Sequence, residues 1–244
     1  MAESLSAQLV VAPDLDALSA EVARRMTALV AGALADHGRC TVALAGGRTP
    51  ERLYRMLAGE HRLGAPWQLV EWFWSDERCV PPDHAESNYR MAREALLAPL
   101  HIAPDMAHRI RGEQDPDAAA AGYEALLRDR LTAGRFDLVL LGVGADGHTA
   151  SLFPGSAALA EGERWVVAVD AGATLPVPRR ITLTYPVLDQ AGAVFMLVSG
   201  AGKHEAVGRM LAGDRSAPAA RVRPAGTLVW FMDRAARDGA PDPA

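Results

Sequence analysis

The stretch FDLVLLGVGADGHTASLFPG, residues 136–155, joins an apolar run to a glycine-rich turn that contains a histidine. The glycines of its GVGADG segment have the G-x-G-x-x-G spacing of a dinucleotide-binding turn. However, Asp146 and His148 flank the last of these glycines, and a dinucleotide fingerprint needs no ionisable side chain there. The turn therefore has two interpretations: it holds the pyrophosphate of a cofactor, or it presents a reacting histidine.

The residues after the turn bear on this choice. A dinucleotide-binding unit continues with a full helix and then a strand that ends in an acidic residue about 20 positions on, and Asp170 has that spacing. Pro154 and Gly155, however, would end such a helix after roughly two turns, where a βαβ crossover needs about three or more. Because an imidazole suits a general base near neutral pH, we favour His148 as a catalytic base and keep the dinucleotide site as the alternative.

Apolar runs of strand length alternate along the chain with segments of helical periodicity. The expected strands are residues 8–12, 40–46, 69–75, 136–144, 164–170, 181–185, 193–199 and 227–232. The expected helices are residues 14–35, 50–58, 88–98, 116–132 and 203–212. This alternation predicts an α/β fold in one domain over residues 1–244, with a mostly parallel sheet covered by helices.

Polar loops follow several of these strands, and ligands of such sheets bind outside the carboxyl ends of the strands. The loops are GGRTP at 46–50, SDER at 75–78, ADGHTA at 145–150 and SGAGK at 199–203. We expect them to meet at one rim of the sheet and to form the site there.

The GGRTP loop has the composition of a phosphate-binding turn. Gly46, Gly47, Arg48 and Thr49 precede a helix that we expect to be capped by Thr49, with proline in its first turn. Backbone N–H groups and the positive end of that helix suit a phosphate monoester, although a tight turn with an ordinary cap is the alternative. The loop lacks the lysine of a Walker motif.

Cationic residues in the other loops extend this prediction. Lys203 is the only lysine of the chain, and at a helix start its charge opposes the helix dipole unless an anion lies between them. Arg78 follows a strand, and of Arg179 and Arg180 only one can face the site, for which we expect Arg179. We expect these cations to bind phosphate.

Composition excludes several other classes of function. The net charge of -5 and the absence of a basic block argue against nucleic acid as a partner. No apolar stretch approaches the roughly 18 residues of a membrane span, and the first residues lack the pattern of a signal peptide. Cys40 and Cys79 have no metal-binding spacing, so we expect a cytoplasmic protein without a disulfide framework.

Together the motifs GGRTP, SDER with ESNY, GVGADGHTASLFPG, RRITLT and SGAGK, in this order, closely resemble those of the 6-phosphogluconolactonase family. The resemblance spans residues 40–203 in its motifs and essentially the whole chain in its order of elements. GADGHTASLFPG is its most specific block. The related glucosamine-6-phosphate deaminases share the D-G-H turn but continue with an FNEP-like segment where this chain has SLFPG.

The resemblance implies a modified Rossmann-like fold of the sugar-phosphate isomerase and deaminase type, which binds no dinucleotide. It implies hydrolysis of 6-phospho-D-glucono-1,5-lactone in the pentose phosphate pathway, with no metal and no organic cofactor. The family's catalytic histidine falls on His148, and its phosphate-binding elements fall on residues 46–49, Arg78, Arg179 and Lys203.

Some points stay open at this level. Either Asp146 or Asp76 assists His148, by orienting the imidazole or the sugar hydroxyls. The rival functions are a sugar-phosphate deaminase or isomerase, a dehydrogenase and a non-catalytic sugar-phosphate sensor. We expect a small-molecule lactone as the partner, and a monomer or a weak homodimer.

Overall fold

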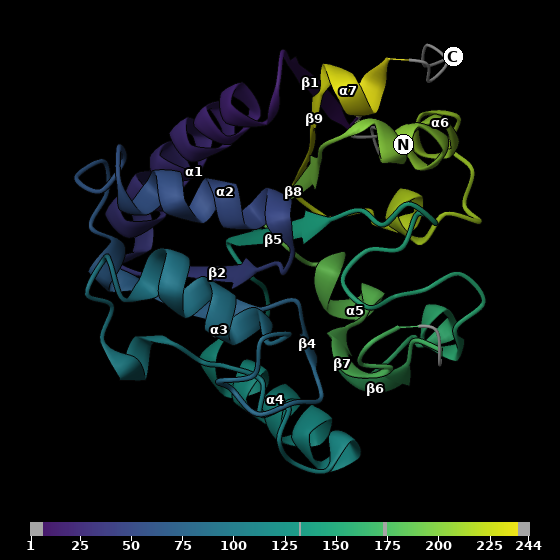
Figure 1. Cartoon of the computed structure of the whole chain (residues 1–244). Coiled ribbons are helices and arrows are strands. Elements are labelled where there is room, and N and C mark those ends of the chain that lie inside the picture. Colours follow the sequence, from purple (N-terminus) through teal and green to yellow (C-terminus); the bar gives the residue numbers. More distant parts are fainter. Residues whose placement is uncertain (1–6, 132, 173–174, 239–244) are drawn as a thin grey trace.

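A six-stranded sheet lies at the centre of the computed structural model, which describes residues 7–131, 133–172 and 175–238. Its strand order is β1-β9-β8-β5-β2-β3, and all neighbouring strands are parallel (Figure 1). The strands are β1 Gln8–Ala12, β2 Cys40–Leu44, β3 Val70–Trp74, β5 Leu138–Gly142, β8 Ala193–Val198 and β9 Thr227–Asp233. The α/β fold with a parallel sheet is confirmed.

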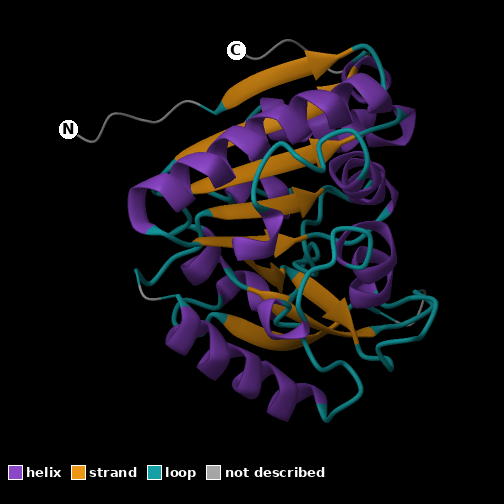
Figure 2. Ribbon diagram, turned by 90° about the vertical axis from the view of Figure 1, so that its left-hand side faces the viewer, coloured by secondary structure: helices purple, strands orange, loops and turns teal. Residues whose placement is uncertain are grey.

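Helices cover both faces of this sheet, and the strands all point the same way between them (Figure 2). The helices are α1 Leu15–His37, α2 Arg48–Ala58, α3 Asn88–Ala92, α4 Pro116–Arg130, α5 Tyr185–Leu188, α6 His204–Leu211 and α7 Arg234–Arg237. A π-helical turn, Arg93–Leu97, extends α3, and short 3-10 turns occupy Trp67–Leu69, Pro104–Met106, Ala157–Ala160, Ala201–Lys203 and Pro218–Arg221. No helix among the described residues combines the length and the apolar character that crossing a bilayer requires.

The strands of the large sheet are apolar on both faces because helices pack on both sides. Every residue of β2 is buried, and Trp72 and Trp74 of β3 are fully buried, as core residues rather than site residues. The core therefore ends where the strands end, and the polar loops begin at that edge.

A second, antiparallel sheet lies beside the first, and the sequence did not predict it. It consists of β4 Asp76–Arg78, β7 Arg179–Leu183 and β6 Val166–Asp170, in the order β4-β7-β6. The two sheets meet at Ser75, whose N–H donates to Leu44 while its carbonyl accepts from Leu183. The segments at 164–170 and 181–185 are strands, as expected, but they do not join the parallel sheet.

The starts of α3 and α2 differ in how they are capped. Ser87 caps α3, since its hydroxyl accepts from the N–H of Arg90. The expected cap at Thr49 is wrong: α2 is preceded by Gly47, whose φ of 99° only glycine adopts easily. Arg48 and Thr49 therefore lie in the first turn of α2.

The dinucleotide interpretation needs a full helix after Gly147, but residues 148–156, all of them described, contain no helix. Ala150 has a φ of 47°, outside the helical region, and the hydroxyl of Thr149 donates to the carbonyl of Gly142. Asp170 lies at the end of β6 in the antiparallel sheet and accepts from Gly172. A dinucleotide turn needs the missing helix, so that alternative is contradicted.

Glu77 connects the second sheet to α3. Its side chain is 2% exposed and accepts hydrogen bonds from the N–H groups of Arg78, Asn88 and Tyr89 and from the hydroxyl of Ser87. This carboxylate explains why SDER and ESNY occur together: the first segment supplies the acceptor and the second supplies most of the donors.

We predict that Glu77→Ala lowers the free energy of unfolding by at least about 3 kcal/mol, because it leaves several buried donors without an acceptor. The control is Glu94→Ala, which removes an exposed ion pair with Arg90 and should change stability by less than about 1 kcal/mol. Urea unfolding followed by tryptophan fluorescence measures both. Equal effects of the two variants would contradict this role of Glu77.

Candidate active site

A cavity of about 250 Å³ opens at the carboxyl ends of the strands of the large sheet, and all the predicted loops reach it. Of the residues predicted for the site it brings together Gly46, Gly47, Arg48, Thr49, Asp76, Arg78, His148 and Lys203. Its wall also contains residues that the sequence analysis did not single out, among them Ser75, Asn88, Arg180 and Ser199.

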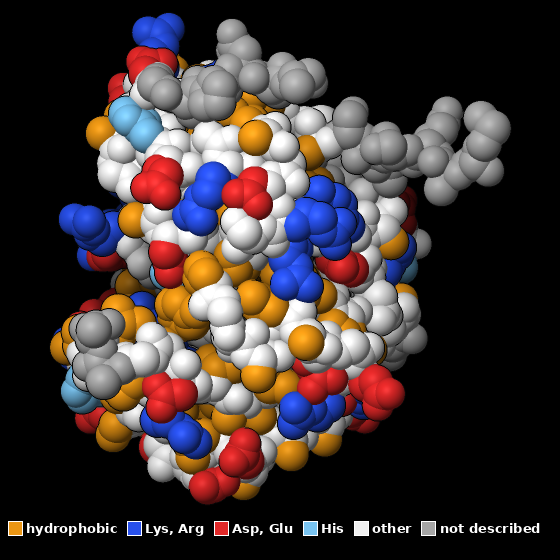
Figure 3. Space-filling model, turned by 90° about the vertical axis from the view of Figure 1, so that its right-hand side faces the viewer, with side chains coloured by type: hydrophobic (Ala, Val, Ile, Leu, Met, Phe, Trp, Pro, Cys, Tyr) orange, Lys and Arg blue, Asp and Glu red, His pale blue; other side chains and the backbone are white. Residues whose placement is uncertain are grey.

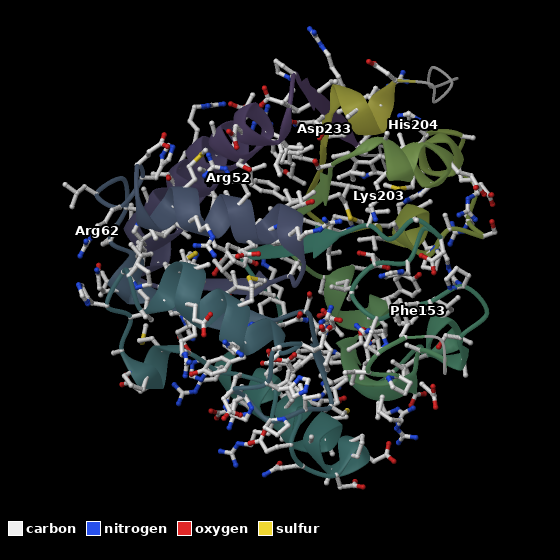
Figure 4. The ribbon with its side chains drawn as sticks, viewed as in Figure 1. Arg52, Arg62, Phe153, Lys203, His204 and Asp233 are labelled. Carbon is white, nitrogen blue, oxygen red and sulfur yellow. The ribbon has the colours of Figure 1, made fainter. Side chains whose placement is uncertain are left out.

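His148 and Asp146 form a short polar contact at this site. The Nδ1 atom of His148 lies 2.6 Å from Oδ1 of Asp146, and the imidazole packs on the ring of Phe153 at 4.5 Å between centroids. Figure 4 shows Phe153 on the loop below Lys203. Because a carboxylate only accepts, we assign the proton to Nδ1, which leaves Nε2 as the basic nitrogen.

Asp146 is ionised at neutral pH. Partial burial works against its charge, but the hydrogen bond and charge of His148, together with backbone N–H donors, lower its pKa to about 2. A carboxylate that stays ionised over the working pH range fixes the orientation of the imidazole.

The glycines of the turn make this pair possible. A Cβ atom on Gly144 would lie 2.1 Å from Nδ1 of His148 and 2.5 Å from Oδ1 of Asp146, so any larger residue would separate the two side chains. Gly147 has a φ of 86° and closes the turn by donating to the carbonyl of Gly144. The G-x-G-x-x-G spacing thus serves a presented side chain.

The loop at residues 46–49 and Lys203 form a positively charged part of the cavity. No side chain caps α2, so its first N–H groups remain for an anion. Burial and the nearby charge of Arg48 lower the pKa of Lys203, and Asp146 partly offsets this. Neither Arg48 nor Lys203 forms an ion pair with another described residue, which is the arrangement that an incoming anion would stabilise.

Arg180, and not Arg179, faces the cavity. In the antiparallel register Arg180 lies opposite Arg78, whereas Arg179 lies opposite Asp170 and is exposed. Burial lowers the pKa of Arg180, and the charge of Arg78 lowers it further. The expectation for Arg179 is therefore wrong, because the pairing of β7 with β4 and β6 decides which of the two arginines faces the cavity.

Asp76 is buried and hydrogen-bonded away from the imidazole. Its Oδ2 accepts from the hydroxyl of Ser151 at 2.6 Å, and its Oδ1 accepts from the amide of Asn88 at 3.1 Å. Of the two carboxylates that the sequence left open as partners of His148, Asp146 is the one in contact with the ring.

Asn88 links two walls of the cavity, since its side chain contacts both Asp76 and Gly46. A Cβ atom on Gly46 would lie 2.0 Å from Oδ1 of Asn88, so the first glycine of GGRTP is needed for the asparagine of ESNY to fit.

The hydroxyl of Ser199 donates a hydrogen bond to Asp233, which also accepts from the N–H of Gly200. Figure 4 shows Asp233 above Lys203.

The surface of the face that carries α6 is mixed in charge (Figure 3). Figure 3 shows acidic and basic side chains interspersed with hydrophobic ones on the face that carries α6, so this face offers no single-sign surface for nucleic acid.

Within residues 7–131, 133–172 and 175–238, no group of three or more His, Cys, Asp or Glu side chains is placed to hold a metal ion.

Comparisons with known proteins show the family of this chain. The family model described as "Glucosamine-6-phosphate isomerases/6-phosphogluconolactonase" matches residues 13–230. A 6-phosphogluconolactonase of Synechocystis is 39% identical over 220 residues, 86% of this chain and 89% of that protein. The solved 6-phosphogluconolactonase of Trypanosoma brucei superposes with a TM-score of 0.82 at 30% identity, over 96% of this chain and 98% of that one.

A monomeric glucosamine-6-phosphate deaminase superposes with a TM-score of 0.81 over 94% of this chain and 98% of that one, but at 21% identity, which shows the shared fold alone. The α/β fold of that superfamily is thus confirmed for this chain. On the family match and the identity to its curated relatives, the chain belongs to the 6-phosphogluconolactonase family, within the superfamily of glucosamine-6-phosphate isomerases and 6-phosphogluconolactonases.

Proposed function

We propose that this 6-phosphogluconolactonase hydrolyses 6-phospho-D-glucono-1,5-lactone to 6-phosphogluconate with His148 as the general base. The observation that carries the proposal is the contact between His148 and Asp146 at the wall of the cavity. It leaves Nε2 of the imidazole as the atom that can accept a proton from water. Positioned acid–base groups of this kind accelerate reactions by about 10²- to 10⁴-fold.

The charges of the cavity support a phosphorylated substrate. Its lining contains the cations Arg48, Arg78, Arg180 and Lys203, and Asp76 is the only carboxylate among the described residues that line it. A phosphate dianion would relieve the repulsion within the two cation pairs, Arg48 with Lys203 and Arg78 with Arg180. We assign phosphate binding to residues 46–49 and these cations, with Arg180 in the place expected for Arg179.

The chemical step needs no covalent nucleophile because a lactone carbonyl is already electrophilic. Nε2 of His148 takes a proton as the water oxygen bonds to C1, and the carbonyl oxygen becomes an oxyanion that backbone N–H groups of the glycine turns or a nearby cation stabilise. When the oxyanion collapses, the bond from C1 to the ring oxygen breaks. His148 returns its proton to that oxygen, and the product carries a hydroxyl on C5 and a carboxyl on C1.

Asp146 and Asp76 have separate roles in this proposal. Asp146 holds the imidazole in the tautomer with a free Nε2 and stabilises the imidazolium that forms during the reaction. Asp76 faces the same cavity without touching the ring and accepts a hydrogen bond from the sugar. Binding energy from the remote phosphate fixes C1 beside the base.

The test of the proposed base is His148→Ala. With lactone freshly generated from glucose 6-phosphate, we expect kcat to fall by about 10²- to 10⁴-fold while the affinity for 6-phosphogluconate stays within a few-fold. The control is His37→Ala, which removes a histidine paired with Asp137 at the end of α1. A variant at 148 with normal turnover would exclude the role, and release of ammonia from glucosamine 6-phosphate by the wild type would favour a deaminase.

A matched pair of variants tests the position of the arginine. Arg180→Ala should weaken 6-phosphogluconate binding by about 10-fold or more, because charge-assisted hydrogen bonds to phosphate are strong. Arg179→Ala, one residue away and exposed, should change the affinity less than about two-fold. Calorimetric titration measures both, and the reverse order of effects would contradict the assignment.

The single lysine allows a test of charge against shape. Lys203→Ala should weaken binding of 6-phosphogluconate, and Lys203→Arg should fail to restore the wild-type affinity, because a planar guanidinium does not fit a site built around a compact ammonium. Fluorescence titration gives the dissociation constants. Full affinity in the arginine variant would show that charge alone matters there.

A further inference from the structure

We propose that Ser151 is a positioning residue: it holds the Asp76 carboxylate so that this group accepts a hydrogen bond from a ring hydroxyl of the substrate. The inference rests on the proposed function, since it needs a hydroxylated sugar in the cavity. It assigns a role to a side chain that does not itself line the cavity.

Asp76 is an unusual group for its surroundings. It is 5% exposed, and among the described residues it forms no ion pair, although three arginines line the same cavity. Arg78 donates instead to the carbonyl and carboxylate of Glu86, and Nε of Arg180 donates to the carbonyl of Val177. The side-chain donors to the Asp76 carboxylate are therefore neutral groups, Ser151 and Asn88.

Two such donors are present, one on each oxygen. The Ser151 hydroxyl lies 2.6 Å from Oδ2, and the Asn88 amide lies 3.1 Å from Oδ1. An ionised carboxylate has about four positions that accept hydrogen bonds, so two donors leave acceptor positions free on the side that faces the cavity. Because Ser151 holds one oxygen and Asn88 holds the other, the carboxylate keeps one orientation. Its free acceptor positions therefore point in a fixed direction.

The chemistry of the substrate decides which of its groups can use this acceptor. The phosphate is repelled by Asp76 and is attracted to the cations of the cavity, and the carbonyl at C1 has no proton to donate. The ring hydroxyls are neutral donors, and a hydrogen bond from a hydroxyl to a buried carboxylate is among the stronger kinds. A hydroxyl on C2, C3 or C4 is thus the partner of Asp76.

Ser151 also connects this acceptor to the base. It lies in the same turn as His148, and its hydroxyl reaches across to β4, so one segment positions both groups. The backbone of the turn does not depend on that hydroxyl. The N–H of Ser151 donates to the hydroxyl of Thr182, and the N–H of Leu152 donates to Thr149.

Removing the hydroxyl should therefore release Asp76 without unfolding the turn. Three variants separate donation from packing: Ser151→Ala removes the group, Ser151→Cys keeps its approximate volume but donates weakly, and Ser156→Ala is the control. Ser156 lies in the same loop, and its hydroxyl accepts from Ala158, outside the cavity. Thermal unfolding confirms that each variant is folded.

The experiment measures kcat and KM for the parent lactone and for its 2-deoxy, 3-deoxy and 4-deoxy analogues. We expect Ser151→Ala and Ser151→Cys to raise KM for the parent by about 10-fold, with kcat within a few-fold, and Ser156→Ala to have no effect. One deoxy analogue should be a poorer substrate for the wild type by a similar factor. For that analogue the Ser151 variants should add little further loss, because variant and analogue remove the same contact.

Wild-type kinetics for Ser151→Cys would overturn the inference, since packing would then account for the residue. The inference would also be overturned if, for all three deoxy analogues, the effect of the Ser151 variant and the effect of the missing hydroxyl multiplied. Ser151 would then act independently of every hydroxyl. A wild-type protein that fails to hydrolyse the parent lactone would refute the proposed function itself. The His148→Ala assay detects that failure separately.

Discussion

The hydrogen bond between Asp146 and His148 exists only because Gly144 has no side chain. A methyl group at that position would occupy the space of both partners, at 2.1 Å from Nδ1 and 2.5 Å from Oδ1. The requirement for glycine gives the turn its resemblance to a dinucleotide fingerprint, although the chain that follows does not form a helix. The same glycines that would let a pyrophosphate approach the backbone here let an imidazole fold back onto a carboxylate.

The second constraint is electrostatic. Two pairs of cations face one cavity, and burial and mutual repulsion lower the pKa values of Lys203 and Arg180 within them. Positive charges gathered in this way oppose folding, so the phosphate of the proposed substrate would stabilise the site. Asp76 forms no ion pair with another described residue, so in the proposed mechanism it accepts from the sugar hydroxyls while the cations bind the phosphate.

Much of this arrangement could be predicted from local sequence. The apolar runs give the strands of the parallel sheet, and the rule that ligands bind at their carboxyl ends brings the loops at 46, 76, 148 and 203 to one cavity. The chain after Gly147 does not form the helix of a dinucleotide site because Ala150 adopts a positive φ and Thr149 bonds back to Gly142, neither of which composition reveals.

Contacts between distant segments account for the other differences. The choice between Arg179 and Arg180 depends on the register of β7 against β4, which is set where Ser75 joins the two sheets. Asn88 and Ser151 reach Asp76 from segments 12 and 75 residues away, and no periodicity in the chain marks them. Local patterns show which residues line a site, whereas pairing and register decide which atoms meet.

A crystal structure of the complex with 6-phosphogluconate tests the central claim most directly, because it places both ends of the ligand. If His148 is the base, the C1 carboxylate lies within hydrogen-bond reach of Nε2, about 2.6–3.2 Å or through one water, with the phosphate against residues 46–49 and Lys203. A phosphate seated on His148, with C1 at the far end of the cavity, would contradict the assignment of the base and of the phosphate site together.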